Sequence, residues 1–198
     1  ANVINTKGAI HYLSKKEIDG KSKHLKIDKE NKKIVAFLMG GPNKYFDYSE
    51  DQVDFVFNKI KNLFTADKYK IIIIPSYRTP EHTIKKAYNT FSHDHVVIKE
   101  INKDAYLSSL SICDYAVVTC DSTSMISEAA VTGKPVYVAN MKAIKNNNRF
   151  QNFYSQFKKL GIIRDLENSI DSWSYNTLDE ANRIAPIIKE KMKLNGII

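Results

Sequence analysis

Three consecutive hydroxyl side chains, followed one helical turn later by a carboxylate, form the group in this sequence best suited to chemistry. Asp121-Ser122-Thr123-Ser124 follows an apolar run and opens a helical pattern, and Glu128 lies four residues beyond Ser124. Hydroxyl oxygens cap a helix, and the free amides and positive dipole end of its first turn attract anions. We therefore expect a diphosphate at this helix start and a ribose diol at Glu128. A well-capped helix with a solvated glutamate is the plainer alternative.

A glycine pair follows the first apolar run of the chain. Ile34 to Met39 ends at Gly40 and Gly41, where the backbone can turn sharply and approach a ligand closely. Exposed amides in such a loop can cradle an oxyanion. An ordinary turn between a strand and a helix explains the pair equally well.

A third polar loop follows the second apolar run, Ile71 to Ile74. It carries Ser76, Arg78 and Thr79 just before a helical pattern that starts with proline. A guanidinium recognises phosphate in a bidentate manner, and hydroxyls can satisfy the remaining oxygens. The loop is a candidate phosphate contact, although a surface arginine in a turn is common.

Apolar runs alternate with amphipathic stretches between these loops. The runs lack polar alternation, which is typical of strands buried on both faces of a parallel sheet. Strands alternating with helices at this spacing predict right-handed crossovers and a Rossmann-like α/β fold with helices on both faces. In such a sheet, ligands bind beyond the carboxyl ends of the strands, where all three loops lie. The expected strands are residues 34–39, 71–74, 96–98, 115–119 and 135–138, and the expected helices are residues 49–64, 80–91, 105–112, 122–132, 149–160 and 178–194.

Several local features carry narrower predictions. Ser49 and Gln52 have the spacing of a capping box, and Pro186 should kink or restart the last helix. Val3 and Ile4 are strand-like. Phe150, Phe153, Tyr154 and Phe157 form an aromatic stripe that we interpret as a docking face, most simply one that packs on another domain.

Composition narrows the class of protein. The 198 residues are 43% hydrophobic, which is enough for a sizeable core, and no apolar run is long enough for a membrane-spanning helix. The net charge of +8 favours an anionic partner. Nucleic acid is a disfavoured partner, because the lysine-rich segment between Lys15 and Lys33 has no interleaved aromatic residue and is explained by a solvated linker. The two cysteines and the absence of a signal sequence indicate a cytoplasmic protein with reduced thiols.

No catalytic group or metal site stands out. The five histidines lie in different contexts, and none pairs with a nucleophile or a carboxylate motif. No spacing of His, Cys, Asp or Glu is typical of a metal site. Catalytic residues are therefore not assigned, and no metal or tightly bound cofactor is expected.

The motifs together resemble those of the mitochondrial-fission ELM family. The stretch Asp114 to Val138 is similar to the family signature, Gly40-Gly41-Pro42 matches its GGP loop, and Ser76 to Pro80 resembles its S-R-R-T-P loop with Tyr77 in place of an arginine. The segment from Asn2 to His11 looks like the entrance to the family's C-terminal half. One departure is Asn102-Lys103-Asp104, where an Asn-Pro-Tyr motif is usual.

The resemblance implies the C-terminal, nucleotide-sugar-binding half of a GT-B-type glycosyltransferase. Residues 1–33 would then be a linker entering from a missing N-terminal domain, and residues 34–198 the nucleotide-sugar-binding domain with its C-terminal helices. The donor would be a nucleoside-diphosphate sugar bound without a metal. The residues implied in the donor site are Gly40, Gly41, Ser76, Arg78, Thr79, Asp121, Ser122, Thr123, Ser124 and Glu128. Replacing Arg78 by alanine should then weaken donor binding by about 1.5–3 kcal/mol.

Two other functions are weighed against this one. Bacterial members often carry the label nucleoside-diphosphate-sugar epimerase, but the G-x-x-G-x-x-G start of a short-chain epimerase is absent here. Plant members are associated with mitochondrial division through recruitment of a dynamin-related protein. A catalytically inactive scaffold that binds a protein partner is therefore the alternative. An enzyme of this type would need the missing domain for its acceptor and its catalytic base.

Overall fold

Six parallel strands form one sheet in the order β3-β2-β1-β4-β5-β6. The computed structural model describes residues 3–197. The central strand β4 is buried along its whole length, and β1 is buried after its first residue. This is the Rossmann-like sheet that the continuous apolar runs predicted. The strands are β1 (Lys33–Met39), β2 (Tyr69–Pro75), β3 (Val96–Val97), β4 (Tyr115–Thr119), β5 (Val136–Ala139) and β6 (Ile163–Asp165).

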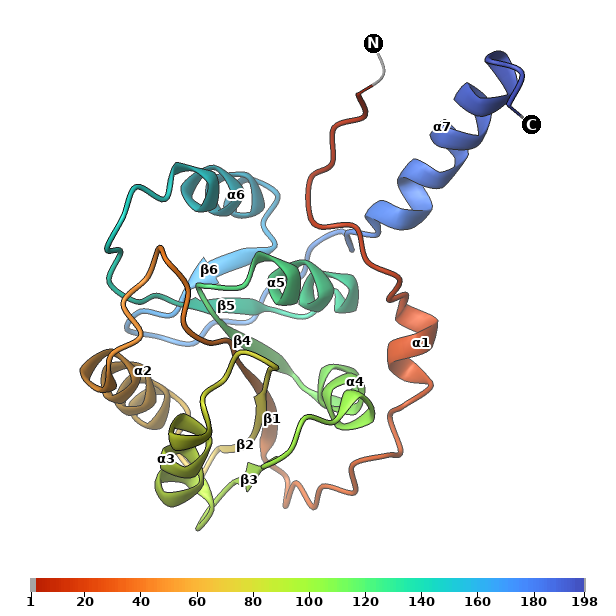
Figure 1. Cartoon of the computed structure of the whole chain (residues 1–198). Helices are drawn as coiled ribbons and strands as arrows, with labels where there is room; N and C mark the ends of the chain where they lie inside the picture. Colours follow the sequence, from red (N-terminus) through yellow and green to blue (C-terminus); the bar gives the residue numbers. More distant parts are fainter. Residues whose placement is uncertain (1–2, 198) are drawn as a thin grey trace.

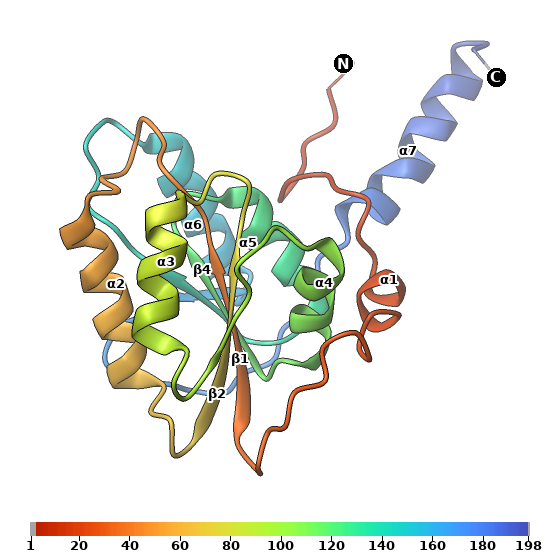
Figure 2. The same cartoon turned by 60° about the horizontal axis from the view of Figure 1, so that its bottom comes forward.

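Helices cover both faces of this sheet. Figure 2 shows α2 and α3 on one side of the strands and α4 and α5 on the other. The split follows from the right-handed crossovers, because the direction of winding reverses between β1 and β4. The helices are α1 (Lys15–Asp19), α2 (Glu50–Leu63), α3 (Glu81–Phe91), α4 (Lys103–Ile112), α5 (Thr123–Ala129), α6 (Asn148–Lys159) and α7 (Glu180–Leu194), and a 3₁₀ turn, η1 (Ala130–Thr132), continues α5.

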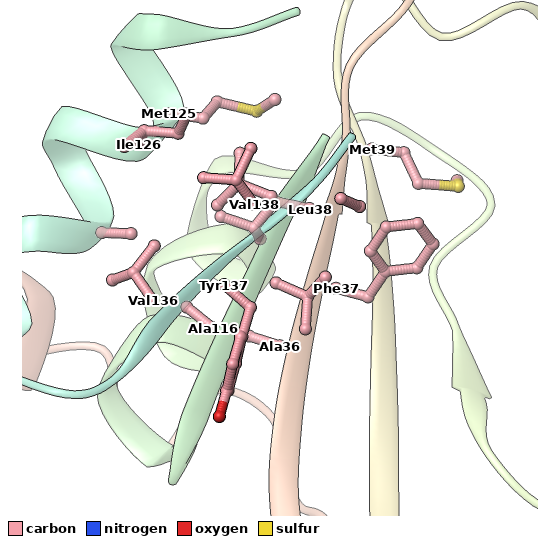
Figure 3. Packing of buried hydrophobic residues seen from close by; sticks show 14 of the residues in the cluster. Ala36, Phe37, Leu38, Met39, Ala116, Met125, Ile126, Val136, Tyr137 and Val138 are labelled. Atoms are coloured by element: carbon pink, nitrogen blue, oxygen red, sulfur yellow. The ribbon is translucent and has the colours of Figure 1, made fainter. Parts of the chain in front are cut away.

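The core lies in two layers, one on each side of the sheet. Figure 3 shows Met125 and Ile126 of α5 facing Leu38 and Val138, while Phe37 points to the opposite side. There the Phe37 ring meets the Phe57 ring of α2 edge to face, at 6.1 Å between centroids. Both sides of each central strand are thus used for packing. This fixes the register of the strands, and with it the positions of the loops that follow them.

The N-terminal segment differs from the prediction. Val3 is exposed and Val3–Ile4 form no strand, while Asn2 lies outside the described residues. The lysine-rich stretch contains α1, whose capping box joins Ser14 and Glu17 and whose Ile18 is buried. The stretch is therefore not wholly solvated, because Ile18 is buried, Lys21 pairs with Asp104 of α4 at 2.9 Å, and the Leu25 amide donates to the Ser108 hydroxyl at 3.0 Å.

One local prediction about a helix is wrong, and another is corrected in part. Ser49 makes no side-chain cap to α2, and the Gln52 amide oxygen instead accepts a hydrogen bond from Lys142 N at 2.9 Å. A tertiary contact has replaced the local one. Of the two outcomes predicted for Pro186, the restart does not occur, because α7 continues through this residue.

Most of the aromatic stripe on α6 is not free to dock on another domain. Phe150, Tyr154 and Phe157 are buried in the core of this domain, and Phe153 is half-buried. The Tyr154 hydroxyl donates to the Cys120 carbonyl oxygen, and the Phe150 ring packs on Phe46 at 5.0 Å. These three side chains attach α6 to the rest of the domain, whereas Phe153 lines a pocket at the surface.

The C-terminal helix leaves the body of the domain. In Figure 1, α7 projects away from the sheet, and the N-terminal segment runs beside its first turns. The Glu180 carboxylate accepts a hydrogen bond from Lys7 N at 2.7 Å, and Arg183 donates to Asn5 O at 2.8 Å. These bonds tie the two ends of the chain together.

Candidate functional site

The strand order brings two of the predicted loops together. β1 and β4 are neighbours, and the chain leaves them toward opposite faces of the sheet. Such a switch point opens a crevice at the carboxyl edge, where ligands bind in folds of this type. Gly40 follows β1 and Asp121 follows β4 within two residues, so both lie at this crevice.

An internal ion pair occupies the crevice. The Arg78 guanidinium donates to the Asp121 carboxylate at 2.6 Å and to the Gly41 carbonyl oxygen at 3.0 Å. The Gly41 amide donates to the same carboxylate oxygen at 3.1 Å. The Asp121 side chain is 1% exposed and that of Arg78 is 42% exposed. The arginine that resembles a phosphate contact therefore neutralises a buried carboxylate of its own chain.

The glycine pair is required by this close packing. A Cβ at Gly40 would lie on the Asp121 carboxylate, and a Cβ at Gly41 would lie on the Arg78 carbonyl group. The Gly40 amide already donates to the Thr119 hydroxyl at 2.8 Å. Both glycine amides are thus engaged within the chain, and the absence of side chains lets three loops meet.

Thr79 closes the same network from the loop after β2. Its hydroxyl donates to the Gly40 carbonyl oxygen at 2.6 Å and lies 2.9 Å from the Met39 carbonyl oxygen. The Ser76 amide donates to the Thr79 hydroxyl at 2.8 Å. Six of the predicted residues therefore hold one another, namely Gly40, Gly41, Ser76, Arg78, Thr79 and Asp121.

A pocket of about 330 Å³ lies next to this network, between α4 and α5. The loop after β2 and the N-terminal segment complete its wall. Most of the lining is apolar or aromatic with a few polar groups, which is the usual character of a small-molecule site. Its lining residues are Tyr12, Leu13, Pro75, Ser76, Tyr77, Ile101, Asn102, Lys103, Tyr106, Leu107, Met125 and Glu128.

Glu128 is fixed in this pocket by a half-buried tyrosine. The Tyr106 hydroxyl of α4 donates to Oε2 of Glu128 on α5. Burial, together with the neighbouring carboxylate, raises the pKa of Tyr106 well above its ordinary value, so the phenol stays neutral and remains a donor. Glu128 itself is half-buried, which leaves part of its carboxylate accessible.

The three hydroxyl residues at the start of α5 have different surroundings. The Ser122 hydroxyl caps the helix by accepting from the Met125 amide at 3.4 Å. Ser124 is exposed, whereas Thr123 is half-buried and lines a separate pocket of about 510 Å³ with Lys7 and Arg149. The N-terminal segment crosses α5 nearby, where the Ala9 amide donates to the Ser127 hydroxyl at 3.0 Å.

Most residues of this pocket were not predicted from the sequence, and two of them are polar groups on α4 or at its start. Tyr106 lies on the side of α4 that faces α5, where its half-buried phenol needs a hydrogen-bond partner. Asn102 is the N-cap of α4, because its side-chain oxygen accepts from the Ala105 amide at 2.9 Å. A helix cap is a sufficient reason for an asparagine at this position.

A Tyr-x-x-x-Lys spacing of the epimerase type occurs twice, at Tyr12 and Lys16 and at Tyr154 and Lys158. Both side chains of the first pair are exposed. The Tyr154 hydroxyl is engaged with the Cys120 carbonyl oxygen inside the core, and Lys158 pairs with Asp165. The two side chains therefore do not form a shared acid–base site.

Two absences among the described residues bear on the class of site. Within residues 3–197, no three His, Cys, Asp or Glu side chains gather in a way that could hold a metal ion. The described helices include none that is long and apolar enough to cross a membrane.

Several solved structures overlap loosely with the chain. UDP-GlcNAc 2-epimerase from Neisseria meningitidis bound to UDP-GlcNAc has a TM-score of 0.44 at 12% identity, over 92% of this chain and 42% of its own. The enzyme of the same name from Methanocaldococcus jannaschii has 0.47 at 14% identity, over 88% and 50%. The wall teichoic acid polymerase TagF has 0.41 at 12% identity, over 91% and 48%. TM-scores below 0.5 do not establish a shared function.

Sequence similarity, unlike these structural overlaps, is strong enough to assign the chain to a family. The uncharacterized protein RP120 of Rickettsia prowazekii is 30% identical over 172 residues, which is 83% of this chain and 48% of that protein. The mitochondrial fission protein ELM1 of Arabidopsis thaliana is 27% identical over 203 residues, which is 98% of this chain and 47% of that protein. The chain thus spans about half the length of these relatives. Because the model of the mitochondrial fission ELM1 family matches residues 1–192, this chain belongs to that family.

Proposed function

We propose that this domain binds the nucleoside-diphosphate part of a nucleotide sugar, as the donor half of a GT-B-type, glycosyltransferase-like protein. The observation that carries the proposal is the position of Glu128. Its carboxylate is held by Tyr106 on the wall of a pocket beside the switch point of a Rossmann-like sheet. A carboxylate in a mainly apolar pocket suits a ligand with hydroxyl groups next to a flat ring.

Each part of the ligand would meet a different wall of the pocket. The base would pack against apolar side chains such as Ile101 and Leu107, and the ribose would bind at Glu128. The diphosphate would extend toward the start of α5, where Ser122, Thr123 and Ser124 lie and where the helix dipole favours negative charge.

Positive charge for the diphosphate would come from the protein. Lys103 lines the pocket and also lies over the Tyr12 ring, with Nζ 4.7 Å from the ring centroid. Arg78 lies at the same edge, but its pairing with Asp121 leaves little net charge there. Lys103 and the helix start would stabilise the leaving diphosphate electrostatically, so we propose binding that needs no metal ion. The acceptor and the catalytic base would come from the rest of a longer protein.

Thermal unfolding with a ligand panel tests the proposal. UDP-, GDP- and ADP-sugars, with a CMP-sugar as the monophosphate comparison, are added to the wild-type chain, to Glu128→Ala, and to Glu190→Ala as an exposed control on α7. A ligand at about 100 times its Kd adds about 2.7 kcal/mol to the stability of the folded state. For a chain of this size, that corresponds to a rise in Tm of about 5–11 °C.

The outcomes separate the two functions. A rise in Tm with one nucleotide sugar, retained in Glu190→Ala and lost in Glu128→Ala, supports the donor site and identifies the base. No rise with any of them, either in this chain or in a protein of the relatives' full length, would contradict the proposal. A scaffold that recruits a protein partner would then be the better description.

A further inference from the structure

We infer that the pocket of about 510 Å³ beside α6 binds an acidic sugar, so that the donor carries a uronic acid in preference to a neutral hexose. This pocket, called the α6 pocket below, lies between α5, α6 and an N-terminal strap formed by residues 5–13. The inference rests on the proposed nucleotide site and adds to it the class of sugar. It starts from the charges that line the pocket.

The strap gives the α6 pocket a fixed wall. The Lys7 amide donates to the Glu180 carboxylate at 2.7 Å, which holds one end of the wall. The Ala9 amide donates to the Ser127 hydroxyl of α5 at 3.0 Å, which holds the other. Between them Gly8 is buried so closely that a Cβ there would lie 3.0 Å from the Ser127 hydroxyl oxygen. A wall with one position is what a preorganised site requires.

The opposite wall is one face of α6. Spacings of three and four residues place Arg149, Asn152, Phe153 and Gln156 together on the helix surface, and all four line the pocket. The Phe153 ring packs on Phe157 with 4.1 Å between centroids, so its orientation is fixed. An aromatic ring offers a flat apolar surface to the C–H face of a sugar, and side-chain amides can bond its hydroxyls. This face of α6 therefore suits a sugar ring.

The charged groups of the α6 pocket are all positive. Among the described residues that line it are Lys7 and Arg149, and no Asp or Glu. Neither of these side chains forms an ion pair within residues 3–197. The Glu180 carboxylate, which accepts from the Lys7 backbone amide, is already paired with Arg183 at 2.7 Å. Two unpaired cations favour a sugar that carries a carboxylate, which a guanidinium can bind in a bidentate manner.

The position of the α6 pocket assigns it to the sugar end of the ligand. Thr123, the first residue of α5, lines this pocket, whereas Met125 and Glu128 of the same helix line the other one. The diphosphate proposed at the start of α5 would lie between the two pockets. With the base and the ribose on the Glu128 side, the sugar beyond the diphosphate would enter the α6 pocket.

Water and salt limit the selectivity. Lys7 and Arg149 are both exposed, so each contact with a carboxylate contributes at most about fivefold in affinity. With two such contacts, we expect a uronic acid to bind about tenfold more tightly than the matching neutral sugar at low ionic strength. The preference should shrink as salt is added, because exposed charges are screened.

Titration calorimetry with matched donors tests the inference. In each pair, a carboxylate replaces the hydroxymethyl group of the sugar: UDP-glucuronate and UDP-glucose, GDP-mannuronate and GDP-mannose, and ADP-glucuronate and ADP-glucose. The nucleoside diphosphate alone is the third ligand for each base. Arg149→Gln and Lys7→Gln each remove one charge from the α6 pocket. Lys159→Gln removes an exposed charge from the same helix outside the pocket and serves as the control.

The readout is the ratio of the affinities for the acidic and the neutral sugar of a pair. We expect Arg149→Gln and Lys7→Gln each to lower this ratio at least about threefold and to leave the affinity for the nucleoside diphosphate unchanged. Lys159→Gln should keep the wild-type ratio.

Three outcomes would contradict the inference. A wild-type chain that binds both sugars of a pair equally would overturn it and leave the proposed function standing. Equal losses for the uronic acid and for the nucleoside diphosphate alone in Arg149→Gln would also overturn it, because the cations would then hold the diphosphate. If no nucleotide binds at all, the inference and the proposed function both fail.

Discussion

Replacing Arg78 by alanine should destabilise the folded domain, in addition to any effect on ligand binding. The guanidinium of Arg78 is the cation that pairs with Asp121, at 2.6 Å. In the variant, the carboxylate keeps the Gly41 amide as a donor but loses its opposite charge. Its other oxygen, Oδ1, is buried and has no hydrogen-bond partner among the described residues even in the wild-type chain. Loss of the Arg78 guanidinium therefore removes the opposite charge from a carboxylate that already has one unpaired oxygen.

The expected cost follows from the burial of the two partners. Removing one member of a buried ion pair costs about 3–5 kcal/mol, because the remaining charge is uncompensated. Here Asp121 is 1% exposed but Arg78 is 42% exposed, so water already reaches one side of the pair. We therefore expect a loss near the lower limit, about 3 kcal/mol. For a chain of this length, that is a fall in Tm of about 6–12 °C.

Chemical and thermal unfolding of three variants measures this effect. The comparison uses Arg78→Ala, Asp121→Asn and the double variant. Because Asp121→Asn removes the charge that Arg78→Ala leaves unpaired, the double variant should be more stable than Arg78→Ala alone by at least about 1 kcal/mol. A folded Arg78→Ala with wild-type stability and a reduced nucleotide affinity would refute the reasoning. Arg78 would then act on the ligand directly, as the family resemblance implies.

Three further predictions follow from other contacts. Gly41→Ala should lose about 3 kcal/mol of stability in urea unfolding, because its Cβ would overlap the Arg78 backbone. Gly161→Ala is the comparison: it has open space around it but a positive φ of 70°, and should lose about 1 kcal/mol. The hydrogen bond from Arg183 lowers the pKa of Glu180 below its ordinary 4.5, so its contribution to stability is present above about pH 4.5 and is lost as the pH falls through the folded value. Glu180→Gln should flatten that part of the stability profile, and an unchanged acid limb would contradict this. Finally, EDTA should leave any nucleotide-induced rise in Tm unchanged, and a rise that disappears with EDTA and returns with Mg²⁺ would show that binding uses a metal.

The sheet could be predicted from the sequence because burial on both faces leaves a continuous apolar run. β1, β2 and β4 carry such runs, and their predicted residues lie within the observed strands. β6 was missed because only Ile163 of its three residues is buried, which leaves no pattern to detect. α1 was missed for another reason. Its capping box at Ser14 and Glu17 is visible in the sequence but lies inside a lysine-rich stretch that suggested a linker.

The candidate site could be predicted only in part. The sequence indicates that the three loops share the carboxyl edge of a parallel sheet, and they do. It does not indicate which residues on that edge bond one another. Arg78 and Asp121 are 43 residues apart, and only the strand order β2-β1-β4 brings their loops across Gly41. Glycines, an arginine and a hydroxyl form the same pattern whether they surround a ligand or one another.

This ambiguity affects how variants at the site should be interpreted. Asp121 directly precedes Ser122, the N-cap of α5, so the network around Asp121 sets where that helix begins. A substitution in the network can therefore change ligand affinity by moving the helix start, without any contact between the residue and the ligand. Glu128 lies further along α5 and has no hydrogen bond to the network, its bond being to Tyr106. Variants whose affinity losses scale with their losses in Tm would therefore identify supporting residues. A loss of affinity at unchanged Tm would identify a ligand contact. We expect Glu128 variants to lose affinity at unchanged Tm, and Arg78 variants to lose affinity and stability together.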